Sequence, residues 1–209
     1  TAPSGNAWTR LANSNPIMEF IDVTLRGSGQ VIFMDNPLTG LLNFVAMFVG
    51  AARGGTSFEV AIGSVIGTMV STAMAYLLKA NRGNLKAGIY GFNGMLVGAC
   101  LPTFLAANPL MWLFLVVGSA VSTIVIMAVA NFLAPYKMPA FTFPFVLTCW
   151  LIVLYAKKIT GLPPSAGGPL PEGGFNFITA GLNSVSQVWF VADWVAGIIF
   201  LVALAVESI

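Results

Sequence analysis

The sequence predicts an all-α integral membrane protein, and its composition and an internal repeat are the main reasons. The 209 residues are 57% hydrophobic and 8% charged, with a mean hydropathy of +0.88. Soluble domains carry about 25% charged residues. Nine Lys and Arg and seven Asp and Glu residues cannot cover a chain of this size with a water-facing surface. Most of the surface must therefore face lipid or other subunits.

The repeat joins two segments that are 157 residues apart. Residues 30–49 (QVIFMDNPLTGLLNFVAMFV) align with residues 187–206 (QVWFVADWVAGIIFLVALAV) without a gap. Identical residues include the pairs Gln30/Gln187, Val31/Val188, Phe33/Phe190, Gly40/Gly197, Val45/Val202, Ala46/Ala203 and Val49/Val206. A period this long is typical of a duplicated membrane protein rather than of a solenoid.

Several functional classes are disfavoured by what the sequence lacks. It contains no histidine, which removes the usual general base, metal ligand and proton relay. Cys100 and Cys149 lie in apolar runs without metal-like spacing, and small buried hydrophobes are their simplest interpretation. The net charge of +2 is too small for a nucleic-acid reader. We therefore expect no enzyme, no metal or other cofactor and no nucleic-acid partner.

The N-terminal segment, residues 1–29, is expected to be loose up to Asn15 and helical after it. Asn15-Pro16 is a typical helix start. Apolar Ile17, Phe20, Ile21 and Leu25 share one face and charged Glu19, Asp22 and Arg26 another, which predicts an amphipathic helix at the membrane interface. The glycines of residues 27–29 are expected to release the chain into the bilayer.

The first membrane repeat is expected over residues 30–156. Its predicted spans are residues 30–52, kinked at Asp35-Asn36-Pro37, then 58–78, 109–133 and 139–156. Gly63, Gly67 and Ser71 recur every four residues in the second span, which predicts a close approach by another helix. Residues 87–107 are uncharged yet rich in Gly and Pro, and we expect a half-crossing helix followed by a short span.

Residues 157–184 are expected to link the repeats, because GLPPSAGGPLPEGG (161–174) is rich in Pro and Gly. Residues 185–209 would then start a second repeat that the sequence does not complete, and residues before Thr1 are also expected to be missing. The charges leave the topology open. If residues 87–107 return to the side from which they start, three basic groups lie on one side of the membrane: Arg26, the cluster of Lys79, Arg82 and Lys86, and Lys157-Lys158. An inverted repeat instead needs an odd number of crossings, which places Lys157-Lys158 on the opposite side.

The polar residues at plausible membrane depth are neutral, and they are accompanied by aromatic residues: Gln30, Gln187, Asn93, Thr142, Thr148, Phe33, Phe92 and Phe190. Amide and hydroxyl oxygens can accept hydrogen bonds from a small neutral solute, and aromatic faces can sandwich a flat one. A single Gln in a span is more often a contact between helices. The recurrence of Gln-x-x-Phe in both copies favours the pore interpretation, because residues three apart share a helix face.

Three stretches in this order resemble the signature motifs of the urea transporter family, bacterial type: LRGSGQVIFMDNPLTGLL (25–42), IYGFNGMLVG (89–98) and FTFPFVLTCW (141–150). The resemblance implies a passive urea channel with two inverted halves, a broken or re-entrant pore helix in each half, and a homotrimer. It further implies that the solute-binding residues are Gln30, Phe33, Phe92, Leu96, Thr142, Gln187 and Phe190. The second copies of the last two motifs are not in the sequence, and Asn36-Pro37 becomes Asp193-Trp194.

We therefore expect a multi-pass protein of the cell (inner) membrane that conducts urea without coupling to ions. A channel for another small neutral amide or for ammonia is the alternative, although the lack of histidine argues against ammonia. A membrane enzyme would need a nucleophile, base or metal cluster, and none is visible in the sequence. A purely structural scaffold would leave the repeated Gln-x-x-Phe without a reason.

Overall fold

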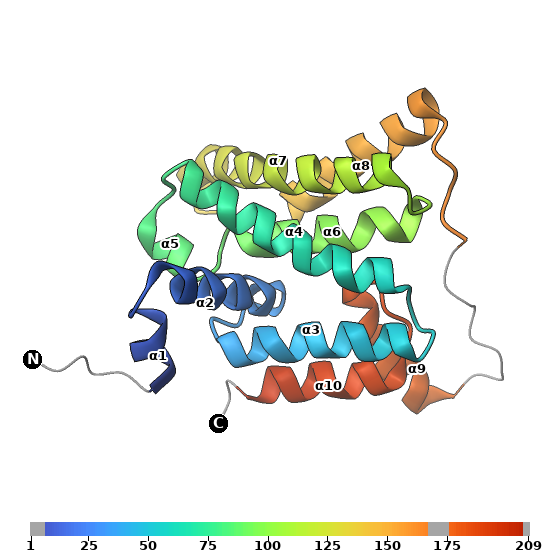
Figure 1. Ribbon diagram of the computed structural model, residues 1–209, viewed down its shortest axis with the longest axis horizontal. Helices are drawn as coiled ribbons and strands as arrows, with labels where there is room; N and C mark the ends of the chain where they lie inside the picture. Colours follow the sequence, from blue (N-terminus) through green and yellow to red (C-terminus); the bar gives the residue numbers. More distant parts are fainter. Residues whose placement is uncertain (1–6, 167–175, 207–209) are drawn as a thin grey trace, which may run out of the picture.

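The structure, a computed structural model, describes residues 7–166 and 176–206 (Figure 1). Residues 1–6, residues 167–175 of the expected linker and residues 207–209 lie outside the described part. The helices are α1 (Ala7–Ala12), α2 (Pro16–Gly29), α3 (Pro37–Ala52), α4 (Phe58–Leu77), α5 (Arg82–Lys86), α6 (Gly91–Phe104), α7 (Pro109–Leu133), α8 (Phe143–Tyr155), α9 (Phe177–Ser186) and α10 (Trp194–Ala205). Short helical turns follow four of them: η1 (Gln30–Ile32), η2 (Ala134–Tyr136), η3 (Ala156–Thr160) and η4 (Gln187–Trp189).

The long apolar helices confirm the predicted membrane class. Helix α4, α7 extended through η2, and α8 extended through η3 are each long and apolar enough to cross a membrane. Two bent helix pairs raise the possible number of spans in the described part from three to five. The expected spans at 58–78 and 109–133 match α4 and α7. The protein is therefore an all-α, multi-pass membrane protein.

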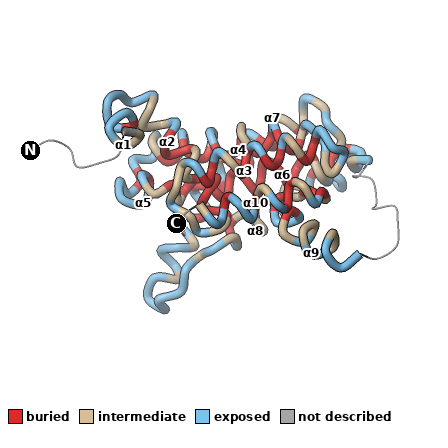
Figure 2. The backbone as a smooth tube through the Cα atoms, turned by 90° about the horizontal axis from the view of Figure 1, so that it is seen from below, coloured by how far each residue is buried: buried red, intermediate tan, exposed pale blue. Residues whose placement is uncertain are grey.

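Residues 87–107, all of which the structure describes, contain one short helix, α6, and the short span that was expected to follow a half-crossing helix in this stretch is absent. Helix α6 has 14 residues, with Pro102 in its last turn, and it is buried from Gly91 to Pro102. At a rise of 1.5 Å per residue it extends about 21 Å, which is less than the hydrocarbon thickness of about 30 Å. In Figure 2, where buried residues are red, α6 lies in the middle of the molecule among the other helices.

The glycines of α6 are contact sites rather than breaks. A Cβ at Gly63 or Gly67 of α4 would lie 2.3 or 2.1 Å from the carbonyl oxygens of Gly98 and Gly94 in α6. Only glycine, which has no Cβ, allows two helix backbones to approach this closely. The small-residue stripe predicted on α4 is thus confirmed, and α6 supplies its matching half.

The repeated sequence forms the same bent helix pair twice. The first pair, α2 with η1 and then α3, bends by 75°, and the second, α9 with η4 and then α10, bends by 71°. Phe33 and Phe190 take the left-handed conformation at the bend, with φ of 62° and 61°. The change from Asn36-Pro37 to Asp193-Trp194 leaves this turn unaltered, because both Asn36 and Asp193 cap the following helix with a side-chain oxygen.

Three N-terminal and linker expectations differ from the structure. Residues 7–12 are helical rather than loose, and most of α9 lies in the stretch of residues 157–184 that was expected to be a linker. Residues 27–29 belong to α2 and lead directly into η1, so the chain stays helical where a break was expected. The reason is that Gly27 is a packing site: a Cβ on it would lie 3.0 Å from the Cα of Gly91. One side of α2 is consequently buried against other helices.

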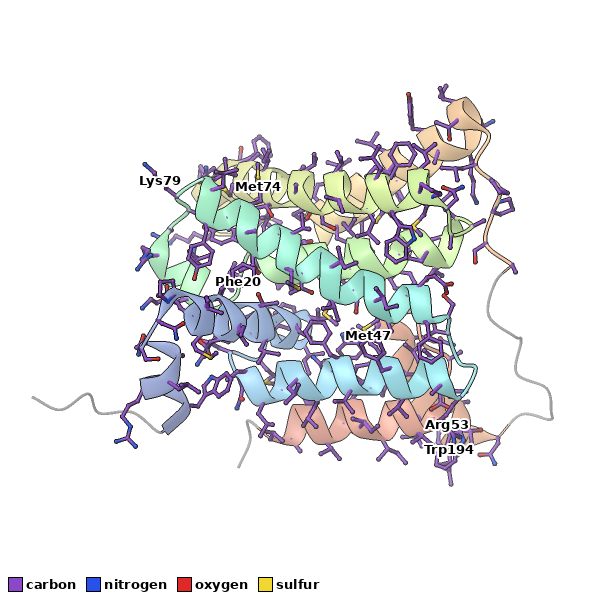
Figure 3. The ribbon with its side chains drawn as sticks, viewed as in Figure 1. Phe20, Met47, Arg53, Met74, Lys79 and Trp194 are labelled. Carbon is purple, nitrogen blue, oxygen red and sulfur yellow. The ribbon has the colours of Figure 1, made fainter. Side chains whose placement is uncertain are left out.

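The two copies contact each other in an antiparallel arrangement, with α3 and α10 side by side (Figure 1). Near the start of α3, the Thr39 hydroxyl donates to the carbonyl oxygen of Ala203 near the end of α10, at 2.9 Å. At the opposite end, Arg53 forms an ion pair of 2.9 Å with Asp193 and lies over the ring of Trp194 (Figure 3). Equivalent helices therefore run in opposite directions.

Candidate functional site

The first cavity, here called the Gln30 cavity, opens beside the first bend and has a volume of about 590 Å³. None of the described residues that line it carries a formal charge. They are Gln30, Phe33, Asn81, Asn84, Ile89, Tyr90, Phe92, Ile126, Met127, Ala130, Asn131, Pro139, Ala140 and Phe141. Amides and aromatic rings are thus its main polar and flat surfaces. Such a lining suits a small neutral solute better than an ion, which would lose its hydration without a charged partner.

Gln30 is held by a hydrogen bond that orients its amide. Its Nε2 donates to the carbonyl oxygen of Ala87 at 2.8 Å, and the residue is 8% exposed. A carbonyl can only accept, so the amide nitrogen must face Ala87 and the amide oxygen must face away. In the described part of the chain, that oxygen accepts no hydrogen bond from the protein. It is therefore available to accept from a solute N–H group.

Aromatic side chains form the walls of this cavity. Phe33 and Phe141 meet edge to face, with ring centroids 5.6 Å apart. Both residues have positive φ values of 62° and 46°, so two unusual backbone conformations direct this ring pair. Phe33 is largely exposed, whereas Phe92 on α6 is buried. The lining thus extends from an exposed ring pair to the buried ring of Phe92.

The second cavity, here called the Phe190 cavity, lies beside the second bend and has a volume of about 440 Å³. Phe190 makes edge-to-face contacts with Phe104 and Phe145, with centroids 6.1 and 6.3 Å apart. This cavity is lined by Cys100, Phe104, Phe145, Val146, Cys149, Trp150, Val153, Lys157 and Phe190. It is aromatic like the first, but it contains thiols and one cationic side chain.

Helix α6 connects the two cavities. Phe92 lines the first and Cys100 the second, and eight residues of helix separate them by about 12 Å along the axis. Leu96 lies between them on α6 and is 3% exposed. The two cavities are therefore the two ends of one buried stretch. A larger cavity of about 650 Å³ at Trp8, Arg26 and Asp35 is charged and has no lining residue on α6.

The remaining expected site residues lie apart from both linings. Thr142 is half-buried and immediately precedes α8, between Phe141 of the first cavity and Phe145 of the second. Gln187 is exposed and, among the described residues, lines neither cavity and has no side-chain partner. The structure thus groups Gln30, Phe33 and Phe92 in one place and Phe190 in another.

Other lining residues were not expected from the sequence. Asn81, Asn84 and Asn131 bring three amides to the rim of the Gln30 cavity, and Phe141 and Phe145 supply rings. The asparagines lie near helix ends, where capping is the ordinary interpretation, and Asn81 does cap α5. Phe141 belongs to the FTFPF stretch, which pointed to this region without distinguishing its individual rings.

The comparisons with known proteins identify the family of this chain. The family model described as urea transporter matches residues 21–209. Urea transporter 1 of Ovis aries is 34% identical over 131 residues, and urea transporter 1 of Mus musculus is 33% identical over 132 residues. These matches cover 61% and 62% of this chain but a third (33%) of each relative's length. The match over nearly the whole chain, which includes the bends of both helix pairs, shows that the chain belongs to the urea transporter family.

Proposed function

We propose that this protein is a channel for the passive diffusion of urea across the membrane. The observation that carries the proposal is the pair of aromatic cavities at the two ends of α6, each headed by the Phe of a repeated bend. The matched relatives bear the name urea transporter 1. Urea is flat and neutral, with four N–H donors and one oxygen acceptor, which fits rings edged by amide oxygens.

The roles of the site residues follow from their chemistry. Phe33, Phe92 and Leu96 select by shape, because a flat solute fits between rings and aliphatic side chains that exclude bulkier ones. Gln30, Gln187 and Thr142 supply oxygen acceptors, and Phe190 walls the second end. Stripping an amide-like group of water without replacement costs several kcal/mol, so these acceptors make passage feasible. Uncoupled transport fits because no described residue lining the Gln30 cavity is charged.

The architecture in this proposal has two inverted halves, with residues 30–156 in one half and α9–α10 opening the other. The antiparallel contact of α3 and α10 supports inversion. So do the loop helix α5 and the end of α8, which lie at opposite ends of the molecule (Figure 1), as an odd number of crossings requires. We further propose a homotrimer with a pore in each protomer, located in the cell membrane, which in a bacterium is the inner membrane.

Phe92→Ala tests the proposal through selectivity. In proteoliposomes we expect the wild type to pass urea and to exclude N,N′-dimethylurea. The Phe92→Ala variant should lower the ratio of urea permeability to N,N′-dimethylurea permeability about tenfold, because removing a buried ring leaves a cavity. Phe58→Ala, which alters an exposed ring at the start of α4, is the matched control and should keep selectivity. Unchanged selectivity in Phe92→Ala would remove Phe92 from the passage, and the absence of urea flux in the wild type would refute the proposed function.

A further inference from the structure

Asn93 on α6 is fully buried and forms hydrogen bonds across to the start of α8. It is 0% exposed. Its Oδ1 accepts from the backbone N–H of Phe145 at 2.9 Å, and its Nδ2 donates to the carbonyl oxygen of Phe141 at 3.4 Å. One amide thus joins both sides of Thr142 to the helix that connects the two cavities.

The N-terminus of α8 needs such a partner because its first N–H groups have no acceptor within the helix. The N–H of Phe143 is satisfied by the carbonyl oxygen of Ala140, and Pro144 has no N–H. The third N–H of the turn, that of Phe145, is the one that Asn93 accepts. Asn93 therefore acts as an N-cap supplied by a neighbouring helix.

Four of the long helices in the described part, α2, α3, α7 and α10, are capped by the side chain of the residue directly before them. Asn15, Asn36, Asn108 and Asp193 are all extended and accept from their own helix. Thr142 has the same position before α8, but its φ of −88° and ψ of 2° are not extended, and its side chain makes no capping bond. Asn93 thus caps α8 in place of Thr142, the residue directly before the helix.

We propose that Asn93 is a positioning residue of the passage: it caps α8 in place of Thr142 and so leaves the Thr142 hydroxyl free to accept from a passing solute. This inference rests on the proposed function for its consequence, and on the hydrogen bonds for its geometry. The bond to the Phe141 carbonyl also holds the backbone of Phe141, a residue of positive φ whose ring lies against Phe33. One buried amide thereby orients both an acceptor and a wall.

A double-mutant cycle in urea flux tests the inference. Asn93→Ala and Thr142→Val should each lower urea flux about tenfold, the size expected for one lost hydrogen bond. The double variant should be no worse than either single one, because without Asn93 the Thr142 hydroxyl turns to cap α8. Independent effects that multiply to about a hundredfold would show that Asn93 is merely structural and would overturn the proposal.

Asn43→Ala is the matched control, because Asn43 is also 0% exposed and donates to the Ser28 carbonyl oxygen away from both cavities. Its effect on flux should multiply with that of Thr142→Val. Hydrogen exchange at the Phe145 amide tests the cap without relying on transport. Exchange should accelerate in the Asn93→Ala, Thr142→Val double variant and stay unchanged in Asn43→Ala. A protein that passes no urea but shows this acceleration would refute the function and keep the cap, whereas unchanged exchange would refute the cap.

Discussion

The bent pair α2–α3 and its repeat α9–α10 have the same backbone conformation at the bend but different neighbouring helices. Gln30 is buried and bonded to the Ala87 carbonyl oxygen, whereas the equivalent Gln187 is exposed and has no side-chain partner in the described part. Helix α2 packs on α3, α4 and α6, while α9 packs mainly on α10. The geometry of the bend is thus a local property of the repeated residues, and the role of each side chain depends on the helices around it.

The interiors of the two copies differ as well. In the first, Asn43 is fully buried and donates to the Ser28 carbonyl oxygen. Its equivalent is Phe200, which stacks on Trp189 with ring centroids 3.8 Å apart and planes within 4°. An amide bonded to backbone and a stacked ring pair therefore stabilise the same fold. The duplicated sequence has kept the bend and replaced the packing inside it.

The largest effect is expected from adding a Cβ at the equivalent glycines Gly40 and Gly197. A Cβ at Gly40 would lie near the carbonyl oxygen of Leu25, and one at Gly197 would lie 2.3 Å from that of the equivalent Leu182. Gly40→Ala should destabilise by about 3 kcal/mol, since α2 is held on several sides and cannot move. Gly197→Ala should cost about 1 kcal/mol, because α9 can shift away from α10. Unfolding in detergent by denaturant measures both values.

Gly181→Ala is the control for this comparison, because nothing lies within 4 Å of a Cβ at that position in α9. It should leave stability unchanged or raise it by up to about 1 kcal/mol through helix propensity. Equal destabilisation at Gly40 and Gly197 would contradict the view that the surroundings of the two copies differ.

An intermediate effect is expected at the two glutamines. Gln30→Leu should lower urea permeability about tenfold, because it removes an oriented acceptor from a cavity wall. Gln187→Leu should lower it about twofold to threefold, since water can replace an exposed amide at little cost. Stopped-flow measurements on matched proteoliposomes would compare them. A larger loss for Gln187→Leu would mean that the second end of the passage is the narrower one.

The smallest effect concerns the junction between the copies. Asp193→Asn should keep the cap of α10, as Asn36 does for α3, and lose only the ion pair with Arg53. That ion pair is partly exposed on the arginine side, so the loss should be about 0.5 kcal/mol. Asp193→Ala should cost about 1 kcal/mol more, because the cap goes too. Thermal unfolding of both variants separates the two contributions, and equal losses would refute the cap.

The sequence predicted the elements that depend on local pattern. Helices α4 and α7, the bend before Asn36, and the close approach at Gly63 and Gly67 all follow from hydropathy, Pro and small residues. The local sequence pattern gave a wrong prediction where a glycine allows close contact between two helices. Gly27 and the α6 glycines resembled flexible joints, yet each one packs against a backbone that no local rule reveals.

The site was predictable in residue type but less so in arrangement. Repetition and motif resemblance indicated Gln30, Phe33 and Phe92, which the structure brings to one cavity. The orientation of the Gln30 amide depends on Ala87, 57 residues away in the sequence. The position of the Phe141 ring depends on a positive φ, which aromatic residues rarely adopt. Asn93 was recognisable as a polar residue in an apolar helix, but its partners lie on another helix. Such long-range contacts have no signature in a single sequence.

The central claim is uncoupled passage of urea, and stopped-flow urea permeability of proteoliposomes tests it most directly. The account predicts urea flux well above that of protein-free liposomes, unchanged when sodium and proton gradients are collapsed and constant between about pH 6 and 8. A flux equal to that of empty liposomes, or one that stops when either gradient is removed, would contradict it.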